Sequence, residues 1–181
     1  MATPASALSE LQYPIGKFNY TGSLTPEQRA KCIQEIAATP KNLRAAVKGF
    51  SKKQLDTPYR DGGWSVRQVL HHVPESHMNA YIRFKLALTE ETPTIRPYDE
   101  ARWAELGDSR DTPIETSLQL LDSLHDRWVR LLRSMPESDF TRKLKHPESG
   151  EMSLDTLLAL YGWHGRHHVG HITALRQRMA W

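Results

Sequence analysis

Apolar residues recur at the spacing of an α-helix in four long segments of the chain, and each segment begins with a helix start signal. The first opens with Thr25-Pro26-Glu27-Gln28, which supplies an N-cap residue, a proline in the first turn and a glutamine at the third helical position. We expect Pro40 to kink or divide this helix and Gly49 to end it. Ser65-Val66-Arg67-Gln68 forms a second capping box and opens a helix that runs to about Glu90.

The third and fourth helices carry similar signals. Thr112-Pro113-Ile114-Glu115 predicts the start of the third, with Thr112 as its N-cap, and Pro136 stops it. Ser153, with Asp155 in the first turn, starts the fourth, which continues toward the C-terminus. Four such helices predict an all-α protein, an antiparallel or crossover-type four-helix bundle with sites built from side chains of facing helices.

Two connections are longer than a minimal bundle requires. Segment 92–110 contains two prolines and a glycine and reads as an irregular crossover between the second and third helices. Segment 140–152 centres on His146-Pro147-Glu148-Ser149-Gly150, which predicts a turn or a short hairpin. Long loops in a compact domain often carry function, so both are candidate functional segments.

Length and composition favour an ordinary globular protein. The 181 residues show no internal repeat and no low-complexity linker, so we expect one domain, 1–181, with residues 1–20 as an N-terminal extended segment. No apolar run approaches the roughly 20 residues of a membrane span, and no secretory signal is visible, so we expect a cytoplasmic protein without a membrane partner. The 24 basic and 21 acidic residues are interleaved, which argues against a nucleic-acid partner.

Histidine is the unusual residue of this composition, with nine copies against one cysteine, Cys32. A single cysteine can form neither an internal disulfide nor a thiolate metal cage, so any metal chemistry must use imidazole. Cys32 itself falls in the apolar pattern of the first helix and is expected to be a buried small hydrophobe.

Seven histidines lie in two short windows, one on the second helix and one on the fourth: His71, His72 and His77, and His164, His167, His168 and His171. The fourth-helix set has the spacing i, i+3, i+4, i+7, which contains two i, i+4 pairs on one face. Such a pair can converge on a metal ion, and a third ligand from the second helix would leave open positions, as in catalytic sites. A polar seam would give the same count, and spacing alone does not choose among His71, His72 and His77. We expect His125 and His146 to be hydrogen-bonded core residues.

Two glycines, Gly162 and Gly165, flank His164 in the fourth helix. Each costs the helix about 1 kcal/mol relative to alanine. Close approach of another helix, or substrate access at a metal, would explain them.

Several motifs together resemble the YfiT branch of the DinB-like superfamily, over nearly the whole chain from about Leu11 to Trp181. The resemblance is carried by YPIGKF (13–18), the segment 54–106 that includes WSVRQVLHHV, LHDRWVRLL (124–132) and YGWHGRHHVGHI (161–172).

This resemblance implies a DinB-type four-helix bundle, commonly a homodimer, that holds one divalent metal ion, zinc or nickel, with three histidines. Two of them lie i, i+4 on the last helix and match His164 and His168, and the third matches His72. Pro74 departs from the usual pattern, and a proline inside a helix predicts a kink beside His72.

The resemblance also implies a metal-dependent hydrolase of a small molecule, in which the metal activates a bound water. Three neutral ligands leave the ion its full charge and so acidify that water strongly. His167 and Glu75 are candidates for the general base or proton shuttle; the alternatives are that each supports the ligands or lies at the surface. One alternative is an S-transferase for a low-molecular-weight thiol of the bacillithiol type. Another is a non-catalytic metal-binding module of a stress response.

Overall fold

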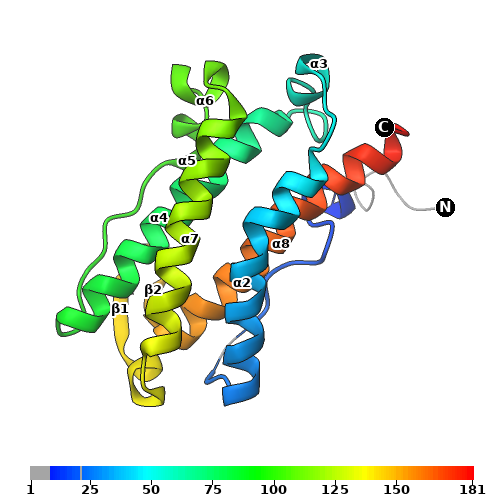
Figure 1. Ribbon diagram of the computed structural model, residues 1–181. Coiled ribbons are helices and arrows are strands. Elements are labelled where there is room, and N and C mark those ends of the chain that lie inside the picture. Colours follow the sequence, from blue (N-terminus) through cyan, green and yellow to red (C-terminus); the bar gives the residue numbers. More distant parts are fainter. Residues whose placement is uncertain (1–8, 21) are drawn as a thin grey trace.

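Four long helices pack side by side in the computed structural model, which describes residues 9–20 and 22–181 (Figure 1). They are α2 (Pro26–Ala46), α4 (Val66–Thr89), α7 (Ile114–Ser134) and α8 (Leu154–Arg178). Helix α2 packs against α7 and α8, and α4 packs against the same two helices on the other side. The fold is therefore an all-α four-helix bundle, as expected.

Shorter elements fill the connections between the long helices. They are α3 (Lys52–Leu55), α5 (Glu100–Trp103), α6 (Gly107–Asp111), the 3-10 helix η1 (Glu137–Thr141), β1 (Lys143–His146) and β2 (Gly150–Ser153). The crossover 92–110 is thus less irregular than expected, because it contains α5 and α6. Within the predicted extended segment 1–20, residues 9–12 form a helical turn, and residues 1–8 lie outside the described part of the chain.

The predicted capping boxes start α2 and α4. The side chain of Thr25 accepts a hydrogen bond from the backbone of Gln28, and Ser65 accepts one from Gln68 in the same way. The predicted cap of α7 is wrong by one residue. Pro113 has ψ of 132°, outside the helical region, so it becomes the N-cap itself and Thr112 lies before the helix.

Neither internal proline divides its helix. Helix α2 continues through Pro40 and α4 continues through Pro74, and both prolines are buried in the bundle. Of the two effects expected of Pro40, a kink or a division of the first helix, the division is therefore wrong. Helix α2 ends at Ala46, and Gly49 follows with a φ of +80°, a conformation that glycine adopts without strain.

The bundle has two apolar clusters, one toward each end. One contains Ile36, Phe84 and Trp128, and the other contains Leu43 and Leu121. On α4, α7 and α8, the residues between the two clusters include histidines, all buried except the half-buried His164: His77, His125, His164, His167, His168 and His171. A layer of imidazoles therefore separates the two halves of the core.

The hairpin predicted in 140–152 is present. Strands β1 and β2 pair antiparallel, with Lys143 opposite Ser153. The backbone of Lys145 also exchanges hydrogen bonds with Pro93 and Ile95 of the crossover. The two long connections are therefore tied together along one side of the bundle. Among the described helices, none is long and apolar enough to cross a membrane.

Candidate metal centre

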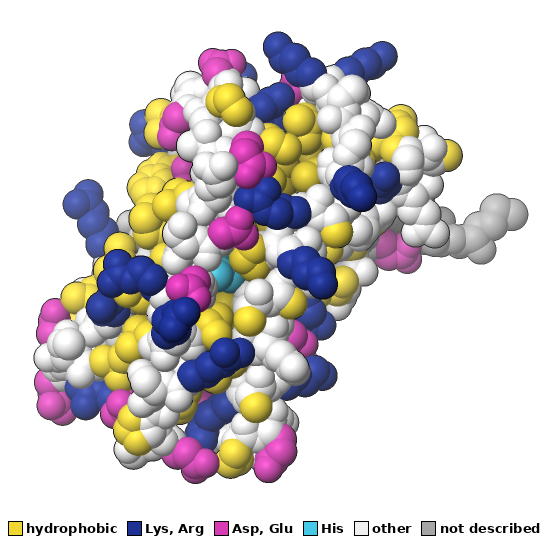
Figure 2. Space-filling view, viewed as in Figure 1, with side chains coloured by type: hydrophobic (Ala, Val, Ile, Leu, Met, Phe, Trp, Pro, Cys, Tyr) yellow, Lys and Arg dark blue, Asp and Glu magenta, His cyan; other side chains and the backbone are white. Residues whose placement is uncertain are grey.

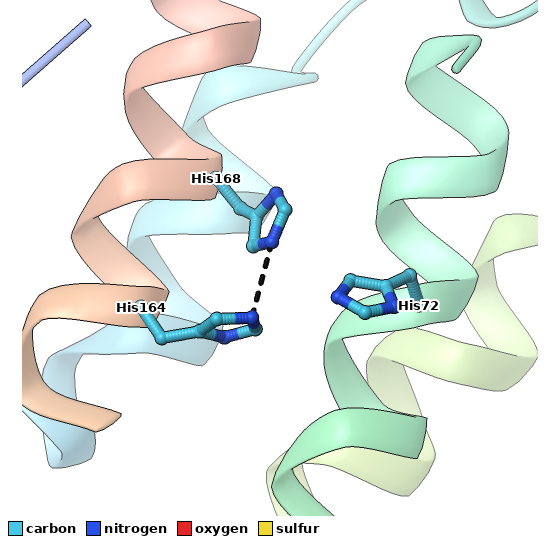
Figure 3. Close-up of side chains that lie close together, drawn as sticks. All are labelled: His72, His164 and His168. Carbon is cyan, nitrogen blue, oxygen red and sulfur yellow. Dashed lines mark hydrogen bonds between the residues drawn. The ribbon is translucent and has the colours of Figure 1, made fainter. Parts of the chain in front are cut away.

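His72, His164 and His168 converge from two facing helices (Figure 3). His164 and His168 lie one turn apart on α8, and their Nε2 atoms are 3.2 Å apart. The ring of His72, on α4, lies with its centroid 5.4 Å from that of His164 and 5.0 Å from that of His168. One nitrogen from each ring lies within 4.8 Å of the others.

This geometry fits a metal ion bound by nitrogen atoms. Zinc–imidazole bonds of about 2.0–2.1 Å at a tetrahedral angle place two ligand nitrogens about 3.3–3.4 Å apart. The separation of 3.2 Å between His164 and His168 agrees with that value. His72 also has a buried Nδ1 atom without a hydrogen-bond partner, and Trp64 packs against its ring at 4.7 Å between centroids.

Burial keeps all three imidazoles neutral. Loss of hydration lowers the pKa of His72 to about 4, and it lowers the pKa of His164 and of His168 well below the usual value. The neighbouring histidines lower these pKa values further, because like charges repel. A neutral imidazole presents the lone pair that a metal ion requires.

A polar cavity of about 440 Å³ opens over the three histidines. Its walls come from α4, from the crossover 92–110, from the hairpin turn and from α8. The lining residues outside the histidine trio are Trp64, Ser76, Arg83, Pro97, Tyr98, Glu100, His146, Glu148, Ser149, Trp163 and His167. A volume of this size suits a small molecule.

Most of these wall residues were not foreseen from the sequence. Arg83 and Glu100 carry no recognisable motif, whereas the aromatic character of Trp64, Tyr98 and Trp163 made them candidates for a pocket wall. His146 was expected to be a core residue, and that is wrong. It is the last residue of β1, its Nδ1 accepts hydrogen bonds from the backbone N–H groups of Glu148 and Ser149 in the turn, and it lines the cavity.

The structure separates the three histidines that were candidates on the second helix. His71 points away from the trio toward the start of α7, where its Nδ1 lies 2.7 Å from the hydroxyl of Ser117. His77 contacts the opposite nitrogen of His164, at 3.1 Å from Nδ1. Of the three, His72 is the one that the structure groups with His164 and His168.

The two candidate proton acceptors lie in different surroundings. His167 lines the cavity, stacks on Trp163 at 4.3 Å and has a buried Nδ1 atom without a hydrogen-bond partner. Glu75 is half-buried and is not among the residues that line the cavity. Burial and the neighbouring Asp108 raise the pKa of Glu75 to about 7.

The glycines beside His164 face helix α2. A methyl group on Gly162 would lie 3.3 Å from Cα of Cys32, and one on Gly165 would lie 2.3 Å from the hydroxyl of Thr39. Close approach of α2 to α8 therefore accounts for both glycines. Cys32 is half-buried at this contact and packs at the edge of the apolar cluster, close to its expected role.

Comparison with known proteins agrees with this fold and site. A model of the DinB superfamily matches residues 35–172. Two relatives, from Bacillus mycoides and Bacillus cereus, are 57% and 56% identical over 174 residues, which cover 96% of this chain and all of each relative. The names of both relatives describe them provisionally as metal-dependent hydrolases.

Two solved structures are also similar. YfiT from Bacillus subtilis, described in the same provisional terms and as a four-helix bundle of unusual topology, has a TM-score of 0.93 at 51% identity, covering 95% of this chain and 99% of YfiT. The four-helix bundle protein TT2238 has a TM-score of 0.55 at 19% identity, over 84% of this chain and 99% of TT2238, a likeness of fold alone. The chain therefore belongs to the DinB superfamily and, within it, to the YfiT-like family of metal-dependent hydrolases.

Proposed function

We propose that the protein is a hydrolase of a small molecule, and that it holds one divalent metal ion with His72, His164 and His168. The observation that carries this proposal is the convergence of three neutral imidazoles at the floor of a polar cavity. The names of the relatives support the same reaction class.

A divalent ion bound there supplies a Lewis acid that polarises a substrate carbonyl or phosphoryl group and acidifies a coordinated water. Side chains of the protein itself accept the proton and hold the imidazoles in place. His167 lies in the cavity wall with a free Nδ1 atom, and we assign it the role of proton acceptor. Trp64 and Trp163 hold His72 and His167 by ring packing, which limits rotation of both imidazoles.

Three further properties belong to the same proposal. Imidazole ligands suit both zinc and nickel, and we propose one of these two as the resident ion. We also propose a homodimer that acts in the cytoplasm, as the resemblance to the YfiT branch implies. Light scattering of the purified protein, with and without metal, tests the dimer.

Metal analysis of protein purified without a histidine tag is the first test. We expect about one equivalent of metal in the wild type and in His71→Gln, and little in His168→Ala. His71→Gln is the matched control because His71 adjoins a proposed ligand but points toward α7. Equal metal content in His168→Ala would contradict the proposed site.

Activity panels then separate the reaction classes. Metal-dependent turnover of an ester, amide or phosphate substrate that is lost in His168→Ala supports the hydrolase. Metal-dependent conjugation of monobromobimane with one low-molecular-weight thiol, without hydrolysis, would replace it by the S-transferase. If the protein binds metal but catalyses neither reaction, the non-catalytic metal-binding module is the remaining alternative.

A further inference from the structure

The histidine layer contains a continuous series of hydrogen bonds that begins at the proposed metal site. Nδ1 of His164 lies 3.1 Å from Nε2 of His77, and Nδ1 of His77 lies 2.8 Å from Nε2 of His125. Nδ1 of His125 lies 2.7 Å from the backbone carbonyl oxygen of Ile36. The series therefore runs from α8 through α4 and α7 to α2.

The carbonyl group sets the direction of every bond in this series, because a carbonyl oxygen can only accept. Nδ1 of His125 must donate to Ile36, so Nε2 of neutral His125 holds a lone pair and accepts from Nδ1 of His77. Nε2 of His77 then holds a lone pair and accepts from Nδ1 of His164. The proton of His164 is thus on Nδ1, and its Nε2 atom is bare.

A second, shorter series reaches His168 from the N-terminal segment. Nε2 of His171 lies 3.0 Å from the carbonyl oxygen of Gln12, so this nitrogen donates. Nδ1 of His171 then holds the lone pair and accepts from Nδ1 of His168, at 3.4 Å. Nε2 of His168 is therefore bare as well.

We propose that the backbone carbonyls of Ile36 and Gln12 fix the tautomers of His164 and His168, acting through His125, His77 and His171, so that both bare Nε2 atoms face one metal ion. The proposal rests on the proposed metal site. It makes His125, His77 and His171 positioning residues, which act through the ligands and do not touch the substrate.

In this arrangement two bare Nε2 atoms face each other at 3.2 Å. Two bare nitrogens repel each other at that distance, and a cation between them removes the repulsion. Metal-binding histidines often donate their second nitrogen to a carboxylate. In both described series the partners are imidazoles and carbonyl groups instead. No negative charge is added in these series, so a bound ion keeps its strength as a Lewis acid.

Nuclear magnetic resonance of metal-free protein labelled with ¹⁵N-histidine tests the tautomers directly. Long-range ¹H–¹⁵N spectra at about pH 8, above the ordinary imidazole pKa, distinguish Nδ1–H from Nε2–H. We expect Nδ1–H at His77, His125, His164 and His168, and Nε2–H at His171. An Nε2–H form at His164 or His168 overturns the inference. Because no metal is present, failure of the protein to bind metal would refute the proposed function alone.

His125→Phe tests whether the carbonyl group of Ile36 sets the tautomer of His164 through His125 and His77. His125 lines a cavity of about 450 Å³ between α2 and α7, where a histidine is visible in the hollow of Figure 2, and phenylalanine keeps that space filled. His77 then loses its acceptor, and its other tautomer donates to Nδ1 of His164. We expect the proton of His164 to move to Nε2, and zinc affinity, measured by chelator competition, to fall about 10–100-fold.

Two further variants separate this effect from lost packing. Ile36→Ala keeps the carbonyl group but removes a fully buried side chain, so it should lower thermal stability and leave the tautomers and zinc affinity unchanged. His171→Phe should move the proton of His168 and leave His164 unchanged. If Ile36→Ala shifts the tautomer of His164 as much as His125→Phe does, or if His125→Phe shifts nothing, the inference is wrong.

Discussion

Replacing Gly165 by alanine should loosen the contact between α8 and α2. The added methyl group would lie 2.3 Å from Oγ1, 2.8 Å from Cγ2 and 3.1 Å from Cβ of Thr39. Thr39 is buried, and its hydroxyl donates to the carbonyl oxygen of Glu35 at 2.9 Å. Rotation of the threonine would break that bond and leave the Cβ contact, so the helices must move apart.

The expected loss follows from two opposing effects. Overpacking a core costs about 1–3 kcal/mol, and contacts this short belong near the upper end. Alanine favours the helix over glycine by about 1 kcal/mol. The net loss in the free energy of unfolding is therefore about 2 kcal/mol, or about 4–8 °C in Tm for a chain of this length. His164 and His168 lie on either side of Gly165, so metal affinity should fall too.

Urea denaturation and thermal melting measure the change. Gly107→Ala is the matched control, because a methyl group there meets nothing within 4 Å, and it should lose no stability. The double variant Gly165→Ala with Thr39→Ala removes the two shortest contacts and should recover most of the loss, read as a double-mutant cycle. A Gly165→Ala protein as stable as the wild type, or a cycle without coupling, would refute this account of the glycine.

Three other predictions concern the metal, a buried ion pair and pH. Zinc at a hundredfold excess over its Kd should stabilise the wild type by about 2.7 kcal/mol, or about 5–11 °C in Tm, and His168→Ala should show no such rise in a thermal shift assay. Asp155 accepts hydrogen bonds from the backbone of Leu24 and from Arg29 at 2.7 Å, so Asp155→Ala leaves the largely buried guanidinium of Arg29 with only the distant carboxylate of Glu137, at 3.9 Å. This change should cost about 3–5 kcal/mol in urea, and a cost below about 1 kcal/mol would contradict it. The pKa of Glu75 is raised from 4.5 to about 7, so the folded state holds a proton that the unfolded chain releases, and wild-type stability should fall as pH rises across that window. Glu75→Gln should remove that part of the slope, and equal slopes for the two proteins would contradict the raised pKa.

Local signals in the sequence account for the helix starts that could be predicted. The capping boxes of Thr25 and Ser65 depend on residues three positions apart, so a single helical turn contains the whole signal. At Thr112 the same reasoning fails, because the backbone of Pro113 stays extended there. The crossover carries no periodic pattern, so its short helices could not be foreseen, although its length marked it as a candidate functional segment.

The candidate site, too, could be predicted only in part from the sequence. The i, i+4 spacing places His164 and His168 together on any helix. The choice of His72 over its neighbours depends on how α4 is rotated toward α8, which residue spacing alone does not determine. The bond between His77 and His125 joins positions 48 residues apart, so only the packed bundle reveals it.

The spacing of His72 and His77 on α4 has a consequence for alignments of related chains. Five positions turn a helix by about 140° beyond a full circle, so the two rings leave α4 in different directions. Both nevertheless lie close to His164, at 5.4 Å and 5.2 Å between ring centroids. One inserted residue between them would rotate one ring about 100° away from the other, so that only one of the two rings could still reach His164. Relatives that keep this chemistry should therefore place insertions and deletions outside 72–77, in the crossover or at the hairpin turn.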